Sequence, residues 1–255
     1  EIYVGSYLVV RDRISCRGLV EIGKNGMLVL PGNTTEDEVR DLNTTGEGLI
    51  LVGTKAYDTK GTPVEGASIY LTDGIDVSDD GFDWNSETCT LTLNGFTRNY
   101  VSGKINTAGI NIDAPGKAVT LVLNGENNLT GLESKNYGIA VQKASLTLTG
   151  GGSLNCTDSG VALAVLSDSL QLAEGCELQD GKEIVGGGGV FYIMESDGQA
   201  FATSFSLKMQ QYDVKVTNDR NGTAKAKAAA KHIADTNSAS GVAQAVEAYA
   251  LGRQP

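Results

Sequence analysis

Five aspartates within eleven residues, at positions 73 to 83, make one segment a candidate for metal chemistry. The overlapping sequence DVSDDGFDWNSE, residues 76–87, has nearly the spacing of a twelve-residue calcium loop. The expected ligands are the side chains of Asp76, Ser78, Asp80 and Glu87 and the backbone carbonyl of Phe82. The competing interpretation is a solvated acidic turn, because Asp83 takes a position that is usually apolar. Calcium is the one cofactor that the sequence suggests.

Three aromatic side chains form a second candidate site, with chemistry suited to carbohydrate. Sugar rings pack their C–H groups on flat aromatic faces, and Trp84, Tyr100 and Tyr137 lie at expected turns or strand ends. Exposed together, they would make a carbohydrate-binding strip. For Trp84 the alternative is a buried cap over the open end of the first repeat.

These residues lie in a region that repeats. Residues 90–95 read TLTLNG, 120–125 read TLVLNG, 145–150 read SLTLTG, and 169–174 read SLQLAE. A second unit alternates with the first, as GINID, GIAVQ and GVALA from residues 109, 138 and 160. Two interleaved β units with a spacing near 25 residues are typical of a solenoid in which each repeat is one coil.

Alternation within each repeat predicts which side chains point inward. Leucine alternates with threonine in TLTLNG, as in a strand that is buried on one face. The Asn-Gly pairs at 94–95 and 124–125 suit corners, because glycine accepts a positive φ angle. Aligning the repeats stacks leucines in two rows, Leu91–Leu121–Leu146–Leu170 and Leu93–Leu123–Leu148–Leu172.

The predicted fold is all-β, a right-handed parallel β-helix with a β cap and a short Ala-rich helical C-terminal tail. We expect an N-terminal β cap or irregular coils at 1–79, β-helix repeats at 80–189, a closing β-hairpin region at 190–221 and the Ala-rich tail at 222–255. Within the first part, TTEDEVRDL at 34–42 predicts one helical turn, and KNG at 24–26 predicts a hairpin or tight turn.

Composition restricts the partners. The net charge of −11 disfavours nucleic acid, which needs lysine and arginine to replace its counterions. No segment is apolar over the length needed to cross a bilayer, so no membrane insertion is expected. The four cysteines include no CxxC pair. Cys89 fits a core position, and Cys156 and Cys176 are either free or paired across coils.

The segment DGFDWNSETCTLTLNG, followed by a GI-x-I unit and VTLVLNGENNLTG, resembles the repeats of secreted surface proteins of Gram-positive, gut-type bacteria. Those repeats are similar to carbohydrate-binding, pectate-lyase-like β-helix modules, and the resemblance covers roughly residues 80–185. It implies an extracellular or cell-surface protein whose signal peptide has been removed, in keeping with a chain that begins at Glu1. YDVKVTNDRNGTAKA at 212–226 is similar to the start of an Ig-like or β-grasp-type surface repeat.

The expected function is non-catalytic binding of a polysaccharide or a host or cell-surface glycan. A structural stalk or an adhesin that binds a protein partner is the first alternative. The second is a calcium-dependent polysaccharide lyase or hydrolase, which on this fold needs acids stacked on adjacent coils and an Arg or Lys base. Asp113 has no acidic counterpart at the matching positions Gln142 and Ala164, so the sequence favours binding over catalysis.

Overall fold

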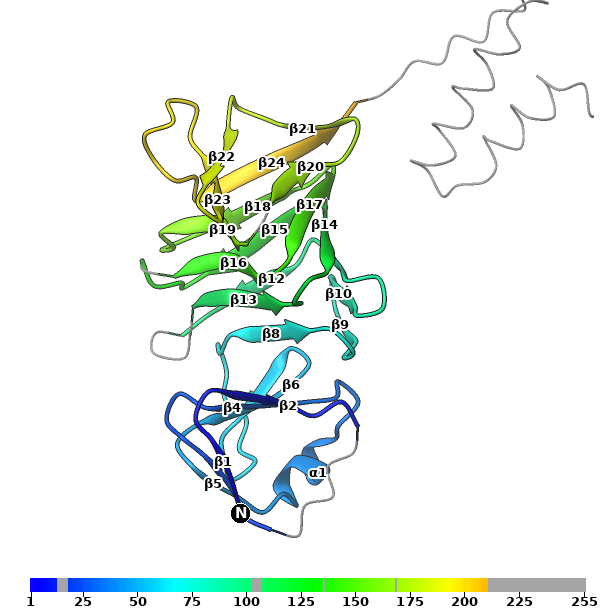
Figure 1. The fold of residues 1–255 in the computed structure, drawn as a ribbon, viewed down its shortest axis with the longest axis vertical. Helices are drawn as coiled ribbons and strands as arrows, with labels where there is room; N and C mark the ends of the chain where they lie inside the picture. Colours follow the sequence, from blue (N-terminus) through cyan, green and yellow to red (C-terminus); the bar gives the residue numbers. More distant parts are fainter. Residues whose placement is uncertain (13–17, 102–106, 135, 168, 211–255) are drawn as a thin grey trace, which may run out of the picture. The chain divides into compact units, whose positions relative to one another are not determined.

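A computed structural model describes residues 1–12, 18–101, 107–134, 136–167 and 169–210. These residues belong to one compact unit, 1–210, which is a β-solenoid built from stacked coils (Figure 1). A second unit, 211–255, lies outside the described residues, and so do the predicted Ala-rich tail at 222–255 and the repeat-like segment at 212–226. The predicted solenoid fold is confirmed.

The N-terminal part of the solenoid consists of coils, with two sheets whose strands run parallel. One sheet has the order β1 (Ile2–Val4), β3 (Val20–Ile22) and β5 (Thr44–Gly46). The other has the order β2 (Tyr7–Val9), β4 (Met27–Leu30) and β6 (Leu49–Val52), and antiparallel β7 (Lys55–Tyr57) ends it. The KNG turn joins β3 to β4, which pair with different strands, so it forms a coil corner and not a hairpin.

The helical turn predicted in this part is α1 (Glu36–Arg40), which follows β4. Thr35 caps it, because the Thr35 hydroxyl accepts from the Glu38 amide while the Glu38 carboxylate accepts from the Thr35 amide. Val39 is the buried residue of the helix and packs with the N-terminal core.

The second part of the solenoid has three sheets with parallel strands from successive coils. The first sheet contains β8 (Ile69–Thr72), β13 (Ala108–Asp113), β16 (Tyr137–Gln142) and β19 (Val161–Leu166). The second contains β11 (Thr90–Asn94), β14 (Ala118–Asn124), β17 (Ser145–Gly150) and β20 (Leu170–Leu172). The third contains β12 (Thr97–Asn99), β15 (Glu126–Thr130) and β18 (Ser153–Cys156).

Antiparallel strands stand at both ends of these coils. Before the first coil, β9 (Val77–Asp79) and β10 (Phe82–Asn85) form a hairpin that pairs with β11. After the last coil, β22 (Glu183–Gly187) and β23 (Val190–Met194) extend the sheet of β19. β24 (Ser204–Met209) lies between β18 and β21 (Cys176–Leu178), so it pairs with the last strand of the third sheet. Such pairing satisfies backbone groups that an open coil would leave unpaired.

Inward leucines form the core, with one correction to the predicted register. Leu91 lies opposite Leu121 as predicted, but Leu121 lies opposite Leu148 and not opposite Leu146. Leu148 then lies opposite Leu172, so the ladder is Leu91–Leu121–Leu148–Leu172. A slip of two residues keeps every leucine on the inner face, which is why the alternation alone could not exclude it.

The cysteines in the described residues are free thiols. Cys89, Cys156 and Cys176 are all buried, and no disulfide joins them. Burial raises the pKa of the Cys156 thiol to about 12, which keeps the thiol protonated at neutral pH. Of the two possibilities for Cys156 and Cys176, the structure therefore shows the free form.

Removing one inner leucine tests the ladder. Leu148→Ala leaves a cavity between two stacked leucines, so we expect the free energy of unfolding to fall by about 2–5 kcal/mol. The matched control is Thr120→Ala, which trims an outward, half-buried side chain of β14. This variant should change the free energy of unfolding by less than about 0.5 kcal/mol. Urea denaturation of both variants measures the difference, and equal effects would contradict the inward assignment.

Candidate functional site

Two of the three predicted carbohydrate-binding aromatics are core residues. Trp84 is 1% exposed, and its indole N–H donates to the Thr72 carbonyl oxygen at 3.0 Å. Tyr100 is 2% exposed, and the Arg98 guanidinium lies 5.4 Å from its ring centre. Neither ring has a free face for a sugar, so the predicted strip of Trp84, Tyr100 and Tyr137 is wrong for its first two members. Strand alternation explains Trp84, which points inward in phase with Phe82.

Tyr137 is half-buried on β16 and belongs to a different aromatic group. Its ring centre lies 6.4 Å from that of Tyr192 on β23, which in turn lies 4.8 Å from that of Phe201. Phe201 is 45% exposed, and Val185 on β22, directly opposite Tyr192, is 44% exposed. We call Tyr137, Tyr192, Phe201 and Val185 the aromatic platform.

Sequence reasoning missed Tyr192 and Phe201. The run VFYIM at 190–194 is apolar throughout, so it carries no alternation that would mark Tyr192 as an outward residue. Phe201 reaches the platform because Met194 and Phe201 form an antiparallel bridge across a loop. Only a strand prediction that paired the end of β23 with residue 201 could have brought these rings together.

The acidic segment folds as a hairpin and not as a calcium loop. Asp79 lies opposite Phe82 and Val77 opposite Trp84, which places Ser78 and Asp80 along the hairpin and buries the Phe82 side chain. Asp76 instead accepts from the Ser86 amide and hydroxyl, both at 2.8 Å. No described His, Cys, Asp or Glu side chains form a group of three that could hold a metal ion. Asp76, Asp80 and Glu87 therefore do not fit calcium as predicted.

A buried carboxylate joins the N-terminal coils to the second part of the solenoid. The Asp113 side chain, 3% exposed, accepts from the Tyr7 hydroxyl and from the Lys143 ammonium group at 3.2 Å. The rings of Tyr7 and Tyr70 are 5.3 Å apart, and they pack beside this network. Both groups paired with Asp113 come from other coils, so Asp113 acts as a tether between strands.

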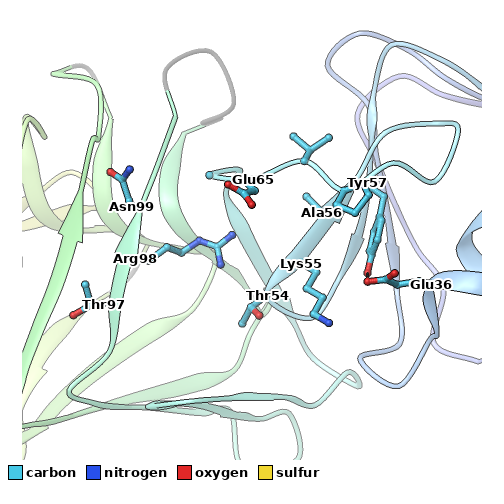
Figure 2. Close-up of a pocket in the computed structure, with 12 residues that line it drawn as sticks. Glu36, Thr54, Lys55, Ala56, Tyr57, Glu65, Thr97, Arg98 and Asn99 are labelled. Carbon is cyan, nitrogen blue, oxygen red and sulfur yellow. Dashed lines mark hydrogen bonds between the residues drawn. The ribbon is translucent and has the colours of Figure 1, made fainter.

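A cleft of about 420 Å³ opens between the N-terminal coils and β12 (Figure 2). Thr97, Arg98 and Asn99 of β12 form one wall, and Lys55 and Glu65 belong to the N-terminal side. Arg98 donates to the Ala67 carbonyl oxygen at 2.9 Å. Arg98 forms no ion pair with any carboxylate in the described ranges.

Two nearby carboxylates, Asp79 and Glu36, are already hydrogen-bonded. Asp79 accepts from the Thr54 hydroxyl and the Asp80 amide, and these bonds, followed by the charges of Lys55 and Arg98, lower the pKa of the Asp79 carboxyl. Glu36 accepts from the Tyr57 hydroxyl and from Arg40, both at 3.5 Å. The cleft therefore holds charges of both signs, Arg98 and Lys55 with Glu65 and Glu36, beside backbone and side-chain hydrogen-bonding groups.

No protein-family model, curated protein or solved structure matches this chain. None of the helices in the described part is long and apolar enough to cross a membrane.

The single tryptophan offers a direct test of the corrected site. Trp84 is buried and hydrogen-bonded, so its fluorescence should have a short-wavelength maximum and resist iodide quenching. Addition of a bound polysaccharide should leave the emission unchanged, whereas urea should shift it to longer wavelength. A shift of the emission maximum on sugar binding, without unfolding, would show that Trp84 belongs to the binding site after all.

The Asp113 network predicts a pH dependence. The hydrogen bond and charge of Asp113 raise the pKa of Lys143 above its ordinary 10.5, and the bond to Asp113, followed by burial, raises that of Tyr7 above 10.0. A raised folded-state pKa stabilises the fold below the unfolded value and loses that effect as the pH rises through the folded value. Asp113→Asn should therefore cost roughly 1–3 kcal/mol near neutral pH, and the difference from wild type should shrink above about pH 10.5.

Urea denaturation across this pH range measures the effect. Asp83→Asn is the matched control, since Asp83 is an exposed acid on β10. A constant difference between wild type and Asp113→Asn at every pH would contradict the tether.

Proposed function

We propose that the protein binds an extracellular polysaccharide without chemical turnover, as a secreted or cell-surface protein. The observation that carries the proposal is the aromatic platform, where the exposed Phe201 and Val185 lie together with two half-buried tyrosine rings. Aromatic rings with polar edges are the side chains that hold sugars by stacking their apolar faces. The resemblance of residues 80–185 to carbohydrate-binding surface repeats points to the same class of ligand.

The platform offers both kinds of contact that a sugar needs. Phe201 and Val185 give apolar surface, and the two tyrosines add hydroxyl groups at its margin. Burial, followed by a hydrogen bond with the Tyr137 hydroxyl, raises the pKa of Tyr192, so the two tyrosine hydroxyls are already linked to each other. The rings are tilted by 41° and 59° to one another, which suits successive sugar units in different orientations better than one flat surface.

Outward polar residues on the other two sheets offer rows of hydrogen-bonding groups of their own. Thr90, Thr120 and Thr147 lie opposite one another on β11, β14 and β17, and Asn128 and Asn155 do so on β15 and β18. Asn155 already donates to Asn128 at 3.1 Å, so this row is ordered before any ligand binds. Such contacts are individually weak, and avidity along a polymer would strengthen them.

Affinity electrophoresis in gels containing neutral or acidic polysaccharides tests the proposal, with Ca²⁺ and again with EDTA. We expect retardation by at least one polymer, and Phe201→Ala or Tyr192→Ala should weaken binding about tenfold, the loss of one stacked ring. EDTA should have no effect, because the acidic side chains of the β9–β10 hairpin form no metal-binding group.

Tyr3→Ala is the matched control, since Tyr3 on β1 is 67% exposed and lies in the N-terminal coils. Unchanged retardation in both platform variants would reject the platform as the site. If no polymer retards the protein, a structural stalk or a protein-binding adhesin becomes the favoured function.

A further inference from the structure

The strand β12 has one free edge. β12 pairs with β15 on one side only, and it stands at the end of its sheet, in the order β12-β15-β18-β24-β21. The Asn128 amide donates to the Phe96 carbonyl oxygen, and the Tyr100 amide donates to that of Thr130, both at 2.8 Å. Backbone groups alternate in direction along a strand, so those of Thr97 and Asn99 point away from β15.

These outward groups have no backbone partner within the described part of the chain. The next outward amide, that of Val101, donates to the Gly66 carbonyl oxygen at 3.0 Å, which ends the free edge after Asn99. The free edge therefore offers two N–H and two C=O groups, from Thr97 and Asn99. A row of unpaired backbone groups is a template for one more strand.

The free edge opens into the cleft and not into bulk solvent. Thr97, Arg98 and Asn99 line it, and Figure 2 shows Glu65 and Lys55 across from them. The N-terminal coils contribute no described strand to the sheet of β12, which leaves room for the cleft. Residues of β7 and of the turn after it line the opposite side. An added strand would therefore have β12 on one side and the N-terminal coils on the other.

Charge limits the occupant further. The Arg98 guanidinium is fixed by the Ala67 carbonyl oxygen and by the Tyr100 ring, so it loses little conformational entropy on binding. Lys55 is exposed at the same cleft. Within the described residues Arg98 forms no ion pair at contact distance, and its buried Nε has no hydrogen-bond partner, so an acidic side chain in the ligand is favoured beside Arg98.

We propose that the free edge of β12 binds an extended, acidic peptide segment of a protein partner by β-strand addition. Backbone hydrogen bonds to Thr97 and Asn99 would hold the segment, and Arg98 with Lys55 would select its acidic residue. The peptide needs free N–H groups, so proline is excluded at the bonding positions. This proposal is independent of polysaccharide binding at the aromatic platform, because it rests on other residues.

Fluorescence anisotropy with a labelled seven-residue peptide, Thr-Val-Thr-Asp-Thr-Val-Thr with blocked ends, tests the proposal on the full chain. We expect saturable binding that weakens at least tenfold when alternate peptide nitrogens are methylated, and also when lysine replaces the aspartate. These two probes use the unaltered protein, so they decide the proposal even if a variant fails to fold. Equal binding of the methylated and unmethylated peptides, or no binding of the aspartate peptide, would overturn it.

Protein variants locate the binding to β12. Thr97→Pro removes one outward N–H but leaves the bonds to β15, a substitution that edge strands accept. It should weaken binding about tenfold, whereas its matched control Thr97→Val, which keeps the N–H, should not. Arg98→Gln should lower affinity for the aspartate peptide more than for one with asparagine in its place. Full affinity in Thr97→Pro, or displacement of the peptide by a polysaccharide, would reject the edge as a peptide site.

Discussion

The stacking of inward side chains between neighbouring parallel coils is the constraint on which the rest of this structure depends. Each strand must place its apolar residues opposite those of the next coil, as Leu121 does with Leu91 and Leu148. A buried leucine contributes about 1.5–3 kcal/mol, so the ladder fixes which face of every strand is interior. Trp84 and Tyr100 are buried because their side chains point inward, whereas Tyr192 alternates with the buried Ile193 and stays half-exposed.

The break between the two stacks of coils is a second constraint on the structure, and the proposed peptide site depends on it. The N-terminal coils have two described parallel sheets and the later coils have three, so the third sheet starts at β12 without a neighbour on one side. Arg98 points inward and lies opposite Leu129 of β15. It stands at the end of the third sheet that adjoins the cleft. A charge is tolerated there because the Arg98 guanidinium reaches a backbone carbonyl oxygen and the cleft. The Asp113 network helps to hold the two stacks of coils together.

Much of the fold could be predicted from the sequence, because the solenoid repeats its alternation several times. The glycines of both Asn-Gly pairs have positive φ angles, and Thr35 begins the helical turn. The register between β14 and β17 could not be predicted, since a slip of two residues preserves the inner face. The candidate site was harder to predict from the sequence. The spacing of the acidic residues suggested a calcium loop, but Val77 pairs with Trp84 and the segment folds as a hairpin. Contacts such as Tyr192 with Phe201 depend on closing strands whose pairing no repeat specifies.

Disulfide formation between engineered cysteines would test the coil register most directly, because the stacking of inward side chains follows from it. In a background with Cys16→Ser, Thr120→Cys combined with Thr147→Cys places two cysteines on directly opposite residues of β14 and β17. Neighbouring strands lie about 4.8 Å apart, within the Cα separation that a disulfide accepts. We expect this pair to oxidise readily, and Thr120→Cys with Ser145→Cys, two residues out of register, to remain reduced. Rapid bridging of the second pair and not of the first would contradict the stacking described above.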